Sequence, residues 1–213
     1  MKRCFILLIA CVVMVSGCAE PASTVPPGNE VLIDVGHGGF DGGAVAPDGS
    51  CEKDYNLAIS LCIRDMLAVL GVSVAMTREK DAALADTKSE DMHRRLAMYE
   101  SASTVISIHQ NYFSIPRYDG TQSFYSSGNV GSQPLAEAIQ SSVVRHLQPE
   151  NKRPVKAVKD GVFLMNTTTS PAVLVECGFL SNQEELSKLK THHYQQQLSF
   201  AIMLGYWDYQ CQK

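Results

Sequence analysis

The stretch Val173-Leu-Val-Glu176-Cys-Gly-Phe-Leu-Ser-Asn182 decides the fold class of this chain. It continues an apolar run from Ala172 to Val175 that shows no alternation, which is typical of a strand buried on both faces of a largely parallel sheet. Glu176 follows this run, at a position where a carboxylate without a partner would be costly to bury. We therefore predict a buried strand with a functional carboxylate at its end.

Two earlier segments place a histidine at the end of a similar apolar run. The run from Val31 to Val35 precedes His37, which stands among glycines, and the run from Thr104 to Ile108 precedes His109 directly. In open sheets of this kind, functional sites gather beyond the carboxyl ends of the strands. We therefore expect both imidazoles to lie at the same edge of the sheet as Glu176.

A fourth polar side chain, Glu52, begins the helix that is predicted over 52–70, after the first strand and its glycine-rich loop. The start of that helix can face the same edge of the sheet. Two imidazoles and one carboxylate can hold a zinc ion and leave one position open for water. We therefore predict that His37, Glu52 and His109 are metal ligands and that Glu176 transfers protons.

The rest of the chain alternates strands with helices. Further strands are predicted over 72–76, 121–125 and 162–165, and further helices over 92–101, 133–147 and 181–190, with a last helix that includes 194–205. Ser181 and Glu184 match a capping box at the start of the 181–190 helix. This order predicts one α/β, three-layer domain with a mixed, largely parallel central sheet flanked by helices.

The N-terminus indicates export. Lys2 and Arg3 precede an apolar run that is too short for a good membrane span, so residues 1–17 are a predicted signal peptide. Val15-Ser-Gly-Cys18 resembles a bacterial lipobox, in which the cysteine receives a diacylglycerol. Residues 18–29 would then be a lipid-anchored tether, and residues 30–213 the folded domain. The alternative is an ordinary cleaved signal with a chance cysteine.

Charge and cysteine usage narrow the class of protein. Without Lys2 and Arg3, 16 Lys and Arg residues stand against 22 Asp and Glu residues, which does not indicate a basic nucleic-acid groove. None of the cysteines in the domain forms a CxxC pair, so a cysteine zinc cluster is not expected. We expect mostly free, partly buried thiols at Cys51, Cys62, Cys177 and Cys211.

Cys177 offers an alternative to metal chemistry, because a thiol beside Glu176 could act as a nucleophile. Successive side chains of a strand point to opposite faces, so Cys177 is expected to point away from Glu176. The metal-dependent interpretation is therefore preferred.

Four blocks of sequence together resemble the zinc-dependent N-acetylmuramoyl-L-alanine amidases of the family called amidase type 3. The blocks are Asp34-Val-Gly-His37-Gly-Gly, Glu52-Lys, Ser107-Ile-His109-Gln-Asn111 and Leu174-Val-Glu176-Cys-Gly-Phe-Leu-Ser-Asn182. They occur in the order that the family has, and the resemblance extends from Val31 to Tyr209. The first block departs from the family at Val35, where proline is usual.

The resemblance implies a role for each matching residue. His37, Glu52 and His109 would hold the zinc ion, and Glu176 would be the catalytic carboxylate.

Two further residues are assigned to substrate binding by the same resemblance. Arg95 matches an arginine of the family's helix, although Tyr99-Glu100 stands where Ala-Asn is usual. Asn111 begins a polar stretch that extends to Thr121 and is expected to line one wall of the substrate groove.

The implied activity is hydrolysis of peptidoglycan at the amide between N-acetylmuramic acid and the L-alanine of the stem peptide, by zinc-activated water. The enzyme would be a lipoprotein anchored to the membrane and facing the cell wall. Two alternatives stay open: a zinc-dependent hydrolase of another amide or peptide, and a non-catalytic wall-binding lipoprotein.

Within the family, three details resemble the germination-specific, spore-cortex type. They are the compact domain without wall-binding repeats, the pair Glu176-Cys177, and Tyr194-Gln195 in the last helix. A role in division or wall turnover stays open as an alternative, as does a protein activator. Nucleic acid is not an expected partner.

Overall fold

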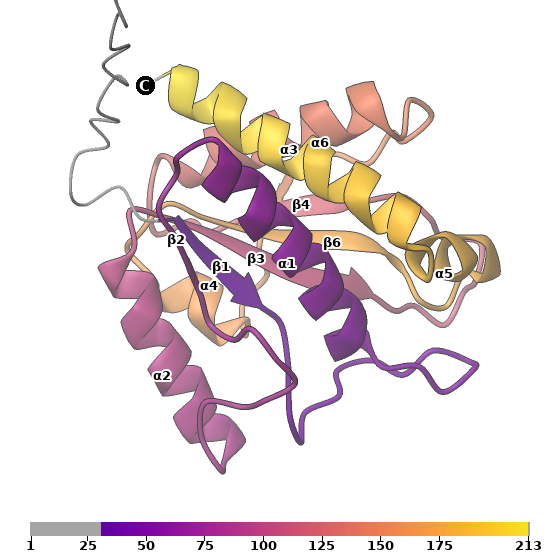
Figure 1. The fold of residues 1–213 in the computed structure, drawn as a ribbon, viewed down its shortest axis with the longest axis horizontal. Coiled ribbons are helices and arrows are strands. Elements are labelled where there is room, and N and C mark those ends of the chain that lie inside the picture. Colours follow the sequence, from indigo (N-terminus) through magenta and orange to yellow (C-terminus); the bar gives the residue numbers. More distant parts are fainter. Residues whose placement is uncertain (1–30, 213) are drawn as a thin grey trace, which may run out of the picture.

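The computed structural model describes residues 31–212, which build a six-stranded sheet with helices on both faces (Figure 1). The signal peptide, the lipidation site Cys18 and the tether that the sequence predicts lie outside the described residues. The strands are β1 (Val31–Val35), β2 (Val74–Met76), β3 (Thr104–Asn111), β4 (Gln122–Tyr125), β5 (Lys156–Ala157) and β6 (Ala172–Phe179).

The sheet has the strand order β2-β1-β3-β6-β4-β5, and only the β4–β6 pair is antiparallel. The central strands β3 and β6 are buried along most of their length because helices cover both of their faces. Their apolar runs therefore lack the alternation of a half-exposed strand. The predicted α/β domain with a mixed, largely parallel sheet is confirmed.

Three long helices cover one face of the sheet, and two helices cover the other (Figure 1). The first group consists of α1 (Glu52–Val69), α3 (Ser132–His146) and α6 (His192–Cys211), and the second of α2 (Lys88–Ser101) and α4 (Phe163–Thr167). A short helix, α5 (Gln183–Leu189), follows β6. Within the described chain, no helix combines the length and hydropathy that crossing a membrane requires.

The first face holds the larger apolar core. Ile33, Ile106 and Val173 from the sheet pack there with Ile59 of α1 and Ile139 of α3, and all five side chains are fully buried. A smaller cluster forms on the other face, from Leu32, Tyr99, Val105, Leu164, Met165, Ala172 and Leu174. The two cores hold the carboxyl ends of β1, β3 and β6 at one common edge of the sheet.

A bulge interrupts the register between β3 and β6 at this edge. His109 pairs with Glu176, and Asn111 pairs with Phe179, so β6 uses one more residue than β3 over the same interval. The extra residue returns the side chain of Phe179 to the face on which Glu176 lies. The bulge therefore places an aromatic ring on the same face of the sheet as the predicted catalytic carboxylate.

Two local predictions were wrong, and one short strand was missed. Residues 162–165 were expected to form a strand, but Phe163–Thr167 is a short helix that packs Leu164 and Met165 into the smaller core. The strand β5 was not predicted, because its two residues are exposed and carry no apolar signal. The cap of α5 is Asn182, whose side chain accepts hydrogen bonds from the backbone of the first turn, and Ser181 instead accepts one from the Phe113 N–H.

Candidate functional site

His37, Glu52 and His109 meet at the carboxyl edge of the sheet, as the sequence predicts. His37 follows β1, Glu52 begins α1, and His109 lies near the end of β3. One potential ligand atom from each side chain lies within 4.8 Å of the other two. Gly36 permits this approach, because a Cβ at that position would stand only 2.5 Å from the His109 ring.

Glu52 is the central member of the cluster. Its Oε1 lies 2.9 Å from His109 Nδ1, and its Oε2 lies 3.2 Å from His37 Nε2. The backbone N–H groups of Ala44 and Gln110 also donate to this carboxylate. Burial alone would raise the pKa of Glu52, but hydrogen bonds from both histidines hold it well below the usual range. Glu52 is therefore a fixed anion, as a metal-binding carboxylate must be.

The donor set fits a zinc ion. Two imidazoles and one carboxylate are ligands that zinc accepts at about 2.0–2.2 Å, and one ligand atom from each of these side chains lies within 4.8 Å of the other two. Three protein ligands leave a fourth position for water or substrate, which is the arrangement of catalytic zinc sites.

The backbone of His37 is held in a left-handed conformation, with φ at 61°. This region is unfavourable for residues other than glycine, so surrounding groups must stabilise it. Two arginines do so, because Arg78 Nε donates to the His37 carbonyl oxygen at 2.8 Å and Arg95 Nη2 donates to it at 2.7 Å. Arg78 and Arg95, which are both buried, thus fix the backbone of this predicted metal ligand.

Arg95 is a positioning residue, and its expected contact with substrate is not supported by its location. Its side chain is only 2% exposed, and the guanidinium forms ion pairs with Asp34 and Asp91 at 2.7 Å. Asp34 also accepts hydrogen bonds from Tyr99 and Ser107. Burial would raise the pKa of Asp34, but Arg95 and these donors lower it. The result is a buried charged network on the face under α2.

Asp41 belongs to the site although the sequence analysis did not single it out. Its Oδ2 lies 3.1 Å from His37 Nδ1 and 3.1 Å from Lys88 Nζ. Burial raises the pKa of Asp41, but the hydrogen bonds from His37 and Lys88 lower it to about 2. A carboxylate on the outer nitrogen of a ligating histidine fixes its orientation and tautomer. In the sequence, the signal for this role of Asp41 is its position four residues after His37.

Glu176 stands beside the cluster on β6, directly opposite His109 in the β3–β6 register. Its Oε2 is buried and accepts no hydrogen bond from the described residues. Burial raises the pKa of Glu176 to about 7, even though the charges of His109 and His37 lower it. A carboxyl group with this pKa can both accept and release a proton near neutral pH.

Cys177 points away from Glu176, as the alternation of strand side chains predicts. It is fully buried in the larger core, and burial raises the pKa of its thiol further above the usual range. A thiolate nucleophile is therefore strongly disfavoured here. The four cysteines of the described chain are all free.

Asn111 ends β3 at the rim of the site and is partly exposed. The segment after it carries exposed apolar and aromatic side chains at Tyr112, Phe113, Ile115 and Tyr118. The expected polar wall over 111–121 is therefore more aromatic than the sequence analysis assumed. Exposed aromatic side chains at the rim of a site suit contacts with the apolar parts of a ligand.

Known proteins resemble this chain over most of its length. A family profile for N-acetylmuramoyl-L-alanine amidases matches residues 31–206. The chain is 35% identical over 204 residues to the germination-specific N-acetylmuramoyl-L-alanine amidase of Bacillus subtilis, covering 91% of this chain and 85% of that protein. It is 25% identical over 239 residues to the amidase AmiA of Escherichia coli, covering 91% of this chain and 81% of that protein.

Solved structures agree with this relationship. The CwlD amidase of Clostridioides difficile, solved in complex with the GerS lipoprotein, matches with a TM-score of 0.83 and 34% identity over 87% of this chain and 100% of that chain. An N-acetylmuramoyl-L-alanine amidase from Clostridium difficile 630 matches with a TM-score of 0.79 and 28% identity over 86% of this chain and 97% of that chain. By sequence, fold and the residues at its site, the chain belongs to the N-acetylmuramoyl-L-alanine amidase family.

Proposed function

We propose that this protein is a zinc-dependent N-acetylmuramoyl-L-alanine amidase that hydrolyses peptidoglycan. The bond cleaved is the amide between the lactyl group of N-acetylmuramic acid and the L-alanine of the stem peptide. The observation that carries the proposal is the convergence of His37, Glu52 and His109 with Glu176, inside a domain that matches the amidase family.

Each residue has a separate task in the proposed reaction. His37, Glu52 and His109 would hold zinc, which supplies Lewis acidity and lowers the pKa of a bound water. Glu176 takes the proton of the attacking water and later delivers it to the nitrogen of the leaving L-alanine. Asp41 orients His37, and Arg78 and Arg95 hold the His37 backbone in place.

Digestion of purified peptidoglycan tests the activity. The full-length protein, loaded with zinc, is expected to release intact stem peptides that begin with L-alanine, and mass spectrometry identifies them. Cleavage within the peptide, or within the glycan, would assign a different hydrolase. Binding to peptidoglycan without any product would indicate a non-catalytic wall protein.

We further propose that the substrate is spore-cortex peptidoglycan and that a protein partner takes part. The proposal is supported by the likeness to the germination-specific amidase of Bacillus subtilis. It is also supported by the likeness to CwlD, which was solved with a lipoprotein partner. Digestion of cortex and vegetative peptidoglycan side by side tests the substrate, since equal rates on both would contradict a cortex preference.

The proposed location is the outer side of the membrane, through a lipid on Cys18. Two or more acyl chains attach a protein stably, whereas one chain is marginal. A tether of about 11 residues, extended at up to roughly 3.5 Å each, limits the reach of the domain to about 40 Å from the bilayer. Fractionation tests this proposal, because a Cys18→Ser protein should leave the membrane pellet and the wild-type protein should stay there.

A further inference from the structure

Arg153 carries a positive charge that no carboxylate of the described residues neutralises. None of the ion pairs within residues 31–212 includes it. Its Nε donates to the Asp119 carbonyl oxygen and its Nη1 donates to Gln122 Oε1 at 3.2 Å, whereas Nη2 donates to no atom of the described chain. Because Arg153 is partly exposed, that side of its guanidinium remains available for an anion.

Aromatic rings hold this guanidinium in place. Its central carbon lies 4.5 Å from the centroid of the Phe179 ring and 5.8 Å from that of Tyr118. A second cation, Arg117, lies 5.9 Å from the Tyr118 ring. Stacking of this kind restricts a long, flexible side chain at little cost in hydration, because guanidinium is weakly hydrated.

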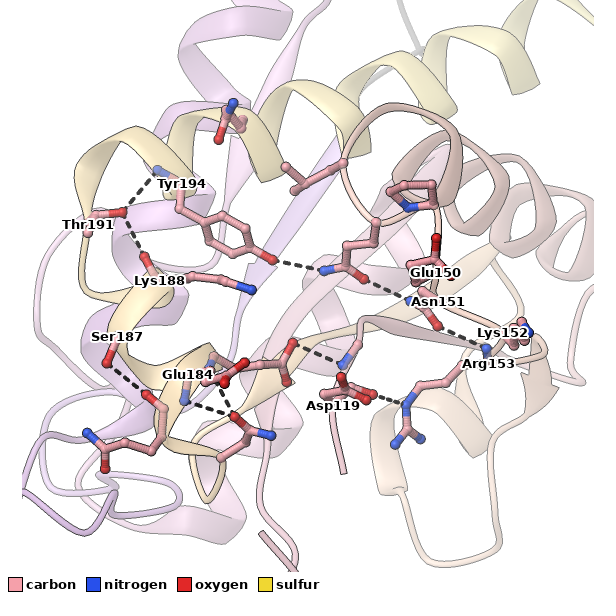
Figure 2. Close-up of a pocket in the computed structure, with 18 of the residues that line it drawn as sticks. Asp119, Glu150, Asn151, Lys152, Arg153, Glu184, Ser187, Lys188, Thr191 and Tyr194 are labelled. Carbon is pink, nitrogen blue, oxygen red and sulfur yellow. Dashed lines mark hydrogen bonds between the residues drawn. The ribbon is translucent and has the colours of Figure 1, made fainter. Parts of the chain in front are cut away.

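The loop that carries Arg153 is also ordered by hydrogen bonds. Gln148 Nε2 donates to the Tyr194 hydroxyl, Asn151 Nδ2 donates to Gln148 Oε1, and the Arg153 N–H donates to Asn151 Oδ1, at 2.8–2.9 Å. Figure 2 shows this series crossing a groove of about 1290 Å³, with Tyr194 at one end and Arg153 beside Asp119 at the other. The cation is therefore positioned before any ligand arrives.

Arg153 is connected to the catalytic edge through Gln122. In the antiparallel β4–β6 pair, Gln122 lies directly opposite Glu176, and such residues share a face with Cβ atoms about 4.5–5.5 Å apart. Phe179, on which Arg153 stacks, lies on the same face because of the bulge in β6. Glu176, Gln122 and Arg153 thus form a row that begins at the catalytic carboxylate and ends at the free cation.

From this row we infer that Arg153 binds a free carboxylate of the stem peptide, on the residue that follows the scissile L-alanine. This inference rests on the proposed function. The lactyl carboxyl is uncharged once it forms the amide, and N-acetylated sugars carry no charge, so the negative charge of the substrate resides in its peptide. One or two residues span up to roughly 7 Å, so a carboxylate on the next residue stays close to the scissile bond along the peptide.

A pair of soluble substrates tests the inference. Both are N-acetylmuramoyl-L-alanyl peptides; in one the next residue carries a free carboxylate, and in the other this group is a carboxamide. The wild-type enzyme should prefer the free acid in kcat/KM by about 10-fold to 100-fold, the range expected for a charge-assisted hydrogen bond. Arg153→Gln should remove most of that preference by slowing the acid alone, and Arg153→Lys should restore part of it.

Lys152→Gln is the matched control, because it removes an exposed neighbouring cation and should leave the preference unchanged. Equal losses on both substrates in Arg153→Gln would overturn the inference, as would a wild-type enzyme that does not discriminate. Calorimetric binding of the two released peptides to the wild-type protein separates the two proposals. Stronger binding of the acid without hydrolysis of either substrate would contradict the amidase activity while supporting the Arg153 subsite.

Discussion

The face of the sheet under α1, α3 and α6 buries the larger apolar core, whereas the face under α2 and α4 buries a smaller apolar cluster together with a charged network. On the first face, side chains such as Ile59 and Ile139 are fully buried among other apolar groups. On the second, Arg95 forms ion pairs with Asp34 and Asp91 inside the protein. The comparison indicates that the first face holds most of the apolar core, whereas the second face holds the charged network that supports the His37 backbone.

The largest effect is expected from removing one of the predicted metal ligands at the carboxyl edge of the sheet. His109→Ala leaves two ligands, which hold zinc poorly, so both bound zinc and peptidoglycan hydrolysis should fall to background. Metal analysis and the digestion assay measure the two effects. The exposed His146→Ala is the control and should keep full zinc content and activity. An active His109→Ala enzyme would contradict a metal site on this edge.

A smaller loss is expected from removing the proton-transfer group and leaving the ligands intact. Glu176→Ala should retain one zinc ion per chain and lose about 10²–10⁴-fold in kcat. The control is Glu184→Ala, an exposed carboxylate in the first turn of α5. Loss of zinc in Glu176→Ala would instead place Glu176 among the metal ligands.

Two substitutions compare the faces directly. Arg95→Met leaves the Asp34 carboxylate buried without its main partner and should lower the free energy of unfolding by about 3–5 kcal/mol. Ile59→Ala on the apolar face should lower it by a similar amount, about 2–5 kcal/mol. Denaturant unfolding of zinc-free protein measures both.

Zinc affinity should differ between these two variants even though their losses of stability are similar. Arg95→Met also removes a donor to the His37 carbonyl and should weaken zinc binding, whereas Ile59→Ala should not. Zinc titration of the folded variants provides the measurement. Equal zinc affinities would mean that the charged network contributes to stability alone.

The smallest of these effects concerns the orientation of one ligand. Asp41→Asn keeps the shape of the side chain but weakens its interaction with His37 Nδ1, and zinc affinity should fall by about 10-fold to 100-fold. Competition with a chelator of known affinity measures the change. Asp160→Asn, at an exposed position, should leave the affinity unchanged.

The length and composition of each apolar run explain which elements of the fold were predicted from the sequence. The runs 31–35 and 104–108 are rich in β-branched residues, which favours a buried strand, and both were placed correctly. The short run at 162–165 is compatible with either a strand or a buried helical turn, and only the packing of Leu164 decides between them. The two-residue strand β5 depends on pairing with β4 and has no local signal.

The site was predictable where chemistry and position in the chain coincide. His37, Glu52 and His109 each lie at the end of a strand or the start of a helix, and the structure brings them together. Arg78, Arg95 and Arg153 act through neighbours that are far away in the sequence, so no local pattern reveals their partners. Long-range contacts of buried or stacked cations are the part that needs a three-dimensional structure.

The pairing of His109 with Glu176 has a consequence for the time course of folding. The two residues face each other across β3 and β6 but belong to distant parts of the chain, and pairings of this kind form slowly because a long loop must close first. Residues 37–109 contain every predicted metal ligand, whereas the predicted catalytic carboxylate belongs to β6. The complete set of site residues therefore exists only where β6 has paired with β3, so hydrolysis requires both parts of the chain to be folded.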